Sequence, residues 1–268
     1  MAVRATAGVL RDVVYAERPG YRPLSLDLHL PAAAAASGPA PPVVVLVHGG
    51  GWRQGSRRTF VPGRTEAETF GRLTARGWAV AAVDYRLSGE ATFPAPLDDV
   101  RDALRWVRDV GGPEHGLDAA RTALWGESAG GHLAALAALA GDPAVRAVVD
   151  WYGPSDLTVL PQEPEPGGGP TREEALLGGP VAAAPAAARA ASPAHQVRAG
   201  APPLLLAHGT ADSFVPYGQS ELFAERLRAA GVPVELQTVP GAEHLWRGVD
   251  DLDTVFAPAL DFLDRHAR

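Results

Sequence analysis

The stretch TALWGESAGGHLAALAALA at residues 122–140 decides the fold of this chain. Its first four residues form the short apolar run expected of a strand that is covered on both faces. Its last twelve residues are small and apolar almost throughout, which predicts a buried helix. Between them, GESAG at 126–130 is a Gly-x-Ser-x-Gly pattern, which alone occurs by chance in about one such chain in ten. The strand before it and the helix after it favour a tight turn with Ser128 exposed at its tip, over a glycine-rich helix start.

Similar runs of apolar, β-branched residues recur on both sides of this stretch. They lie at residues 43–47, 78–83, 145–149 and 204–207, with a more alternating run at 234–239. Residues 24–30 alternate strictly, which is typical of a half-exposed strand near a sheet edge. Stretches at 97–110, 129–140, 219–230 and 251–266 predict the helices. This alternation predicts an α/β fold, with a mostly parallel sheet that has helices on both faces.

One segment, residues 158–201, interrupts the alternation. It is rich in Pro, Gly and Ala, and it includes PQEPEPGGGP at 161–170. A stretch of this length without periodicity is either disordered or a functional lid. Because it lies between two strands, we interpret it as a small, mobile cap inserted in a single domain that spans residues 1–268.

Composition excludes several classes of function. The 24 basic and 31 acidic residues give a net charge of −7, and no basic block is present, which argues against a nucleic-acid partner. The absence of cysteine excludes a thiol nucleophile, a thiolate metal site and disulfides. Neither a signal peptide nor a run of about 20 apolar residues is found. We therefore expect a cytoplasmic protein without a membrane span, a metal or a cofactor.

A serine hydroxyl needs a base to take its proton, and the chain offers eight histidines. His244 is the best candidate, because it follows the last strand in the loop PGAEH and can swing back over the carboxyl edge of the sheet. We expect the other histidines to be solvated (His29, His115, His266), to pack under the serine turn (His132), to brace loops (His48, His208) or to lie in the cap (His195).

The acid that orients the base should follow another strand. Asp212, in HGTAD directly after residues 204–207, would accept a hydrogen bond from the imidazole and stabilise the imidazolium. Ser128, Asp212 and His244 then occur in the chain order expected for this fold. A solvated aspartate and an unrelated loop histidine are each plausible alone, but their joint placement after two late strands favours a catalytic triad.

The glycine-rich loop HGGGW at residues 48–52 follows the strand at 43–47. Its unshielded backbone N–H groups can face a developing oxyanion, and we assign Gly50, Gly51 and Ala129 as the donors. A phosphate-binding loop is the alternative, but no lysine follows, the Gly-x-Gly-x-x-Gly spacing is absent, and no helix starts at once.

Other polar and aromatic residues also follow strands. We expect Asp84, Arg86 and Asp98 to form structural salt bridges or helix caps. Five aromatic residues could line an acyl or alcohol pocket, although ordinary packing is as good an interpretation for two of them, Trp151 and Tyr152. The five are Trp52, Trp151, Tyr152, Phe214 and Trp246.

Together these motifs resemble the α/β-hydrolase superfamily, and in particular its hormone-sensitive-lipase-like and feruloyl- or acetyl-esterase-like branches. The resemblance rests on residues 48–52, DYRL at 84–87, 126–132, 208–212 and GAEH at 241–244. It implies an eight-stranded sheet, the triad named above and acyl-enzyme chemistry without a cofactor. Two departures favour the smaller esterase-like branch: only about forty residues precede Val43, and the usual Tyr-Arg-Leu-Ala-Pro-Glu stretch is YRLSGE here.

The expected activity is therefore that of a serine carboxylesterase acting on small esters, in a protein that could form a homodimer. Three alternatives are an arylformamidase, a prolyl-peptidase-type hydrolase and a non-catalytic ligand-binding protein on a hydrolase scaffold.

Overall fold

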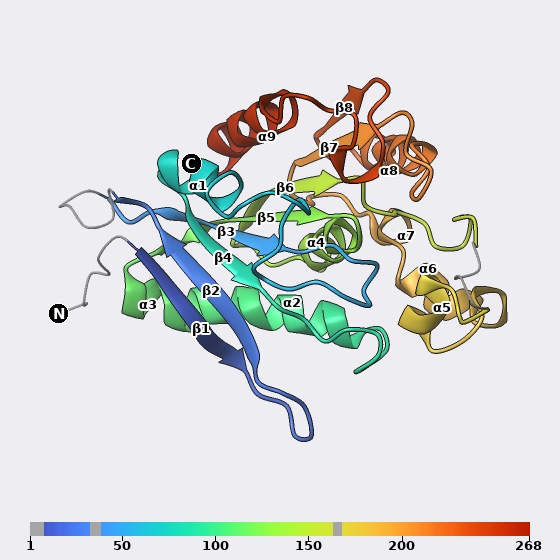
Figure 1. Ribbon diagram of the computed structural model, residues 1–268, viewed down its shortest axis with the longest axis horizontal. Coiled ribbons are helices and arrows are strands. Elements are labelled where there is room, and N and C mark those ends of the chain that lie inside the picture. Colours follow the sequence, from blue (N-terminus) through green and yellow to red (C-terminus); the bar gives the residue numbers. More distant parts are fainter. Residues whose placement is uncertain (1–7, 33–38, 163–167) are drawn as a thin grey trace.

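An eight-stranded sheet with the order β1-β2-β4-β3-β5-β6-β7-β8 runs through the centre of the computed structural model, which describes residues 8–32, 39–162 and 168–268 (Figure 1). The pairs β1/β2 and β2/β4 are antiparallel, and the remaining pairs are parallel. The mostly parallel sheet is thus as predicted. The strands are β1 Gly8–Ala16, β2 Leu24–Leu30, β3 Pro42–Val47, β4 Ala79–Val83, β5 Asp118–Glu127, β6 Val145–Trp151, β7 Leu204–Gly209 and β8 Val234–Val239.

Helices cover both faces of this sheet (Figure 1). On one face lie α2 Ala95–Trp106, α4 Ala129–Leu139 and α8 Gly218–Ala229, and on the other lie α1 Phe70–Ala75 and α9 Asp253–His266. The predicted helix at residues 97–110 is α2 together with a π-helical turn, η2 Val107–Gly111. The shorter elements are α3 Gly112–His115, α5 Arg172–Leu177, η3 Val181–Ala183, α6 Pro185–Ala190, α7 Pro193–Gln196 and η4 His244–Trp246.

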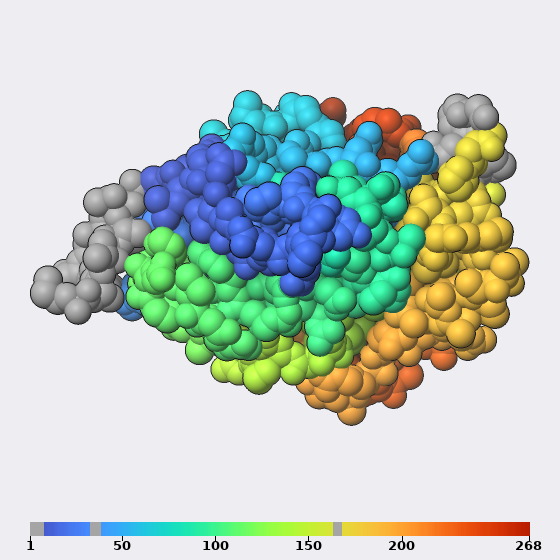
Figure 2. All heavy atoms as spheres, turned by 90° about the horizontal axis from the view of Figure 1, so that it is seen from below, coloured from blue at the N-terminus to red at the C-terminus, as the bar shows by residue number. Residues whose placement is uncertain are grey.

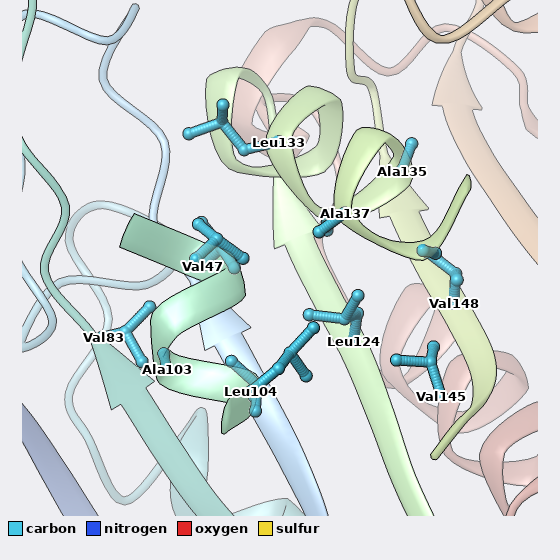
Figure 3. Packing of buried hydrophobic residues seen from close by; sticks show 14 of the residues in the cluster. Val47, Val83, Ala103, Leu104, Leu124, Leu133, Ala135, Ala137, Val145 and Val148 are labelled. Carbon is cyan, nitrogen blue, oxygen red and sulfur yellow. The ribbon is translucent and has the colours of Figure 1, made fainter. Parts of the chain in front are cut away.

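Two apolar clusters, one on each face, explain the continuous hydrophobic strands. In β3, Val43, Val45 and Val47 belong to the cluster that includes α2, α4 and α8. Val44 and Leu46 belong to the other, with α1 and α9. Figure 3 shows the first cluster, where β3, β5 and β6 meet the helices α2 and α4. Since alternate residues of β3 face opposite layers and all are buried, apolar side chains are required at every position.

The N-terminal strands differ from the expectation for the sheet edge. β2 is almost entirely buried, because β1 pairs with its outer side and is itself mostly exposed. The exposed strand β1 lies at the surface shown in Figure 2, in dark blue. His29 in β2, predicted to be solvated, is only 5% exposed and lies edge-on to the Phe70 ring, 4.7 Å between ring centres. Asp27 is also buried, and it is paired with Arg11, Arg57 and Arg58.

The predicted cap segment contains α5, η3, α6 and α7, and its residues 163–167 lie outside the described residues. These short helices occupy one end of the molecule, drawn in yellow and orange (Figures 1 and 2). Backbone hydrogen bonds join the segment to the body: Phe93 donates to the Leu176 carbonyl at 2.7 Å, and Ala194 donates to that of Ser155 at 2.9 Å. Its helices have six residues or fewer, so their periodicity is too short to recognise in the sequence.

Candidate active site

Ser128 lies at the tip of a strained turn between β5 and α4. Its φ of 52° and ψ of −121° are unusual for a residue with a side chain, and its N–H donates to the Trp151 carbonyl at 2.8 Å. Gly126 and Gly130 make this turn possible. A Cβ on Gly126 would lie 2.2 Å from the Gly130 backbone, and one on Gly130 would lie 2.1 Å from the Val47 carbonyl oxygen. The GESAG pattern therefore reflects close backbone packing as well as the need to present Ser128.

The structure brings Ser128, Asp212 and His244 together, from three loops at the carboxyl edge of the sheet. His244 Nε2 is 3.0 Å from Ser128 Oγ, and His244 Nδ1 is 2.6 Å from Asp212 Oδ2. Asp212 follows β7 and His244 follows the neighbouring strand β8, so their pairing is a direct consequence of strand order. This is the nucleophile–base–acid geometry in which a histidine can remove the serine proton.

Asp212 is held in its ionised form. Burial favours the neutral acid, but hydrogen bonds from His208 and His244 outweigh it and hold the pKa of Asp212 well below its usual range. The backbone N–H groups of Phe214 and Val215 each donate to Asp212 Oδ1 at 2.9 Å. His208 is also 2.7 Å from Ser220 Oγ through Nδ1 and 2.8 Å from the Val215 carbonyl through Nε2, which is the bracing role expected for it.

The loop after β3 lies beside Ser128 because β3 and β5 are neighbours. Gly50 and Gly51 have φ values of +111° and +59°, and the Gly50 carbonyl accepts from the N–H groups of Arg53 and Gln54 in a tight turn. Within the part of the chain that the structure describes, the N–H groups of Gly50, Gly51 and Ala129 donate to no protein acceptor. Gly50, Gly51 and Ser128 line one pocket, so these donors are available to a bound oxyanion.

Glu127, the variable residue before the nucleophile, has a role that the sequence analysis missed. Its carboxylate accepts from the Tyr152 hydroxyl at 2.8 Å, from the Val61 N–H at 3.3 Å and from the Gly49 N–H. Burial raises its pKa to about 7, although these hydrogen bonds oppose the shift. Tyr152 in turn lies 4.8 Å from the His244 ring, centre to centre. The only signal for this network in the sequence was a carboxylate directly after the apolar run at residues 123–126 of β5.

A pocket of about 470 Å³ opens over Ser128 and His244. Of the five aromatic residues predicted to line it, only Phe214 does so. The prediction is wrong for Trp52, Trp151, Tyr152 and Trp246, which are each 3% exposed or less and pack into the body of the protein. Trp52 donates to His132 Nδ1 at 3.2 Å, and the other three form a cluster of edge-to-face and tilted rings. Burying rings of this size contributes more to stability than lining an open pocket would.

The three polar residues assigned to the scaffold, Asp84, Arg86 and Asp98, each form an ion pair within the protein. Arg86 makes a buried two-pronged ion pair with Asp99, at 2.7 and 2.8 Å, and Asp84 pairs with Arg57. No three His, Asp or Glu side chains in the described ranges are placed to hold a metal ion together. Nor does any helix there have the length and apolar character required to cross a membrane.

A serine on a strand–turn–helix bend, followed in the chain by an acid and a histidine after the last strands, defines the α/β-hydrolase class. The chain belongs to the BD-FAE family, whose model matches residues 26–227. It is 34% identical to esterase LipQ of Mycobacterium tuberculosis, over 90% of this chain and 58% of that protein. It is 35% identical to esterase LipC of the same organism, over 79% of this chain and 54% of that protein. The chain thus spans a little over half the length of these relatives.

Solved structures show the same fold. A truncated carbohydrate esterase from gut microbiota has a TM-score of 0.81 and 25% identity, and the match covers 97% of this chain and 96% of the other. Esterase 2 of Thermogutta terrifontis has a TM-score of 0.72 and 28% identity, covering 97% and 90% respectively. These comparisons confirm both the α/β-hydrolase fold and the esterase resemblance that the sequence motifs predicted.

Proposed function

We propose that this chain hydrolyses small carboxylic esters through an acyl-enzyme intermediate on Ser128. The observation that carries the proposal is the continuous hydrogen-bond line from Ser128 Oγ through His244 to Asp212, at 3.0 and 2.6 Å. The esterase names of the relatives and of the similar solved structures support the same reaction. They do not favour the arylformamidase, the peptidase-type hydrolase or the non-catalytic alternative.

In the first half of the proposed reaction, His244 Nε2 removes the proton from Ser128 Oγ, and the oxygen attacks the ester carbonyl carbon. The N–H groups of Gly50, Gly51 and Ala129 donate to the oxyanion that forms. His244 then gives its proton to the leaving alkoxide, and the acyl group stays on Ser128. Asp212 keeps the imidazole oriented and stabilises its positive charge while the proton is held there.

The second half repeats these steps with water. His244 takes a proton from water, the hydroxide attacks the acyl carbonyl carbon, and the same three donors bind the second oxyanion. The proton returns from His244 to Ser128 Oγ as the bond to the acyl carbon breaks. The carboxylic acid is released, and Ser128 and His244 are back in their starting protonation states.

Rates on nitrophenyl esters of increasing acyl length test the proposal, with wild type beside Ser128→Ala. Fast release of nitrophenol from acetyl or butyryl esters that Ser128→Ala abolishes would support it. Thermogutta terrifontis esterase 2 is phosphorylated by paraoxon in one solved structure. We expect paraoxon to inactivate this protein with a diethylphosphoryl group on the peptide that contains Ser128. Wild-type inactivity on every ester, or full activity of Ser128→Ala, would contradict the assignment.

A cytoplasmic location and a homodimer stay predictions from the sequence. Size-exclusion chromatography with light scattering tests the second of them directly. The small cap formed by residues 158–201 within one domain is likewise an interpretation. The position of α5 beside the pocket supports it, because Arg172 at the start of that helix lines the pocket.

A further inference from the structure

The pocket over Ser128 has a cationic rim. Besides Gly50, Gly51, Ser128 and His244, it is lined by Arg53, Arg172 and Arg247, and among the residues that the structure describes no acidic side chain lines it. This contrasts with the net charge of −7 on the chain, because the surface as a whole repels anions while this pocket presents guanidinium groups.

Two of these guanidinium groups are held close to the reacting atoms by one aromatic ring. The Cζ atoms of Arg172 and Arg247 lie 5.2 and 5.7 Å from the centre of the Phe214 ring. That ring centre is in turn 5.6 Å from the centre of the His244 ring. Phe214 is 45% exposed, although its backbone N–H is fixed on Asp212. Both cations therefore contact a ring that also packs against the proposed catalytic base, in the pocket that Ser128 lines.

Arg172 is also fitted against the loop that we assign to the oxyanion. A Cβ on Gly51 would lie only 2.7 Å from Arg172 Cδ, so the arginine side chain crosses directly over that glycine. Arg172 is the first residue of α5, whose start is fixed by a capping box between Thr171 and Glu174. The segment interpreted as a cap therefore delivers a cation to the pocket from a defined helix end.

These arginines also interact within the chain. Arg247 Nε lies 3.3 Å from Glu243 Oε2, with both side chains more than half exposed, and Arg53 and Arg172 have further interactions of their own. A guanidinium group carries five N–H donors in a planar fork, so it can bind a ligand while it keeps a protein partner. A planar carboxylate is the anion that matches this fork best.

We infer that the preferred ester carries a carboxylate a few bonds from its scissile carbonyl, and that Arg172 and Arg247 bind this group across the Phe214 ring. The inference rests on the proposed esterase function. It names the substrate class as anionic half-esters or carboxylate-bearing aryl esters, in preference to neutral esters of the same size.

Matched ester pairs test this inference. One pair is 4-nitrophenyl hydrogen adipate and its methyl ester, with the carboxylate on the acyl part. The other is 4-acetoxybenzoate and its methyl ester, with the carboxylate on the alcohol part. We expect at least one anionic member to show kcat/KM about tenfold above its neutral partner at low salt, and this advantage to shrink at about 0.5 M salt because of screening.

Substitutions of the pocket arginines test whether these residues cause the preference for the anionic ester. Arg172→Gln should lower kcat/KM of the preferred anionic ester about tenfold and leave its neutral partner within about twofold, as expected when one charged hydrogen-bond partner is lost. Arg247→Gln, an exposed position, provides a second test should Arg172→Gln disturb α5. Arg189→Gln is the matched control, because Arg189 is an exposed arginine of the same segment that does not line the pocket.

Equal or better turnover of the neutral member in both pairs would overturn the inference while leaving the esterase proposal intact. So would equal losses on both members of a pair in Arg172→Gln and Arg247→Gln. Absence of all turnover would count against the esterase proposal alone. In that case the inference is tested by calorimetry, which measures the affinity of Ser128→Ala for the esters. This variant should bind the esters without cleaving them. Tighter binding of hydrogen adipate esters than of methyl adipate esters supports it, and equal or weaker binding refutes it.

Discussion

Replacing Asp150 with asparagine should make the protein more stable at pH 8 and leave its stability unchanged at pH 4. Asp150 lies in β6 beneath the serine turn, where its Oδ1 accepts from the Gly153 N–H at 3.0 Å. A Cβ on Gly131 would lie 2.1 Å from the same Oδ1, so the carboxyl group is tightly enclosed. An asparagine has the same shape and retains the acceptor, but it carries no charge at any pH.

The direction of the effect follows from the pKa of Asp150. Burial raises this pKa to about 7 from an ordinary value of 3.8, against smaller opposing effects of His208 and the Gly153 N–H. Between these two values the unfolded chain has lost the proton while the folded chain keeps it. The contribution of protonated Asp150 to the free energy of unfolding is therefore complete below pH 4. It decreases as the pH rises and is lost above pH 7. The pKa values of the unfolded and folded states differ by about three units, and each unit corresponds to about 1.4 kcal/mol. The free energy of unfolding should therefore fall by about 4 kcal/mol over this pH range.

Urea denaturation of wild type and Asp150→Asn at pH 4, 5, 6, 7 and 8 measures this difference. Glu127, whose pKa is also raised to about 7 by burial, adds the same trend to both proteins and cancels in the comparison. Asp250→Asn at an exposed position is the control and should show no pH-dependent change. The reasoning would be refuted by a stability difference between Asp150→Asn and wild type that stays constant across this range.

Four further substitutions test the site and its support. Asp212→Asn should lower kcat on nitrophenyl acetate by ~10³–10⁴-fold with little loss of secondary structure, since the imidazole then lacks its anionic partner; near-wild-type turnover would contradict its role. Gly130→Ala should destabilise the fold by about 1–3 kcal/mol or more in thermal denaturation, because its Cβ meets the Val47 carbonyl oxygen at 2.1 Å. Gly179→Ala is the control and should not destabilise the fold, because a Cβ on Gly179 would meet no atom within 4 Å. Arg86→Met should cost about 3–5 kcal/mol in urea denaturation, because buried Asp99 loses its close two-pronged partner and retains Arg18 at 4.0 Å, and a neutral result would show that the Arg86–Asp99 pair is dispensable. Glu127→Leu should cost about 1–3 kcal/mol for each of the donors it orphans at Val61 and Tyr152, and should lower kcat more than Glu127→Gln does.

The central strands and the meeting of Ser128, Asp212 and His244 could be predicted because their signals are local. β3 is apolar at each position from Val43 to Val47 since both of its faces are covered, and a short run of this kind between turn residues is typical of a buried strand. Asp212 and His244 could be paired across 32 residues because each follows a strand, and the carboxyl ends of parallel strands meet at one edge.

The N-terminal strand β1 could not be predicted in the same way. Its sequence GVLRDVVYA mixes charged and apolar residues, and a register shift between Leu10 and Val13 breaks the alternation that would mark a strand. The burial of β2 depends on β1, so the missed strand also explains why His29 was expected to be solvated.

The pocket shows a second limit of sequence patterns. Position after a strand indicates which edge of the sheet a residue occupies, but it does not give the direction of the side chain. Trp151 ends β6 and turns into the apolar cluster with Trp125 and Phe256, whereas Phe214 turns outward over His244. Arg172 begins the six-residue helix α5 and Arg247 follows the short helix η4, and neither element is long enough to show a periodicity that would connect it with Ser128.

The contact of Gly130 with the Val47 carbonyl has an evolutionary consequence. It packs the serine turn closely against the end of β3, which brings the proposed nucleophile next to the donors proposed on both sides of it. Variation there would disturb the proposed reaction itself, whereas the pocket residues Arg172, Phe214 and Arg247 come from three other segments of the chain, although Arg172 also packs over Gly51. Selection could therefore exchange the rim residues one at a time and shift the range of esters accepted, with the chemical machinery left untouched.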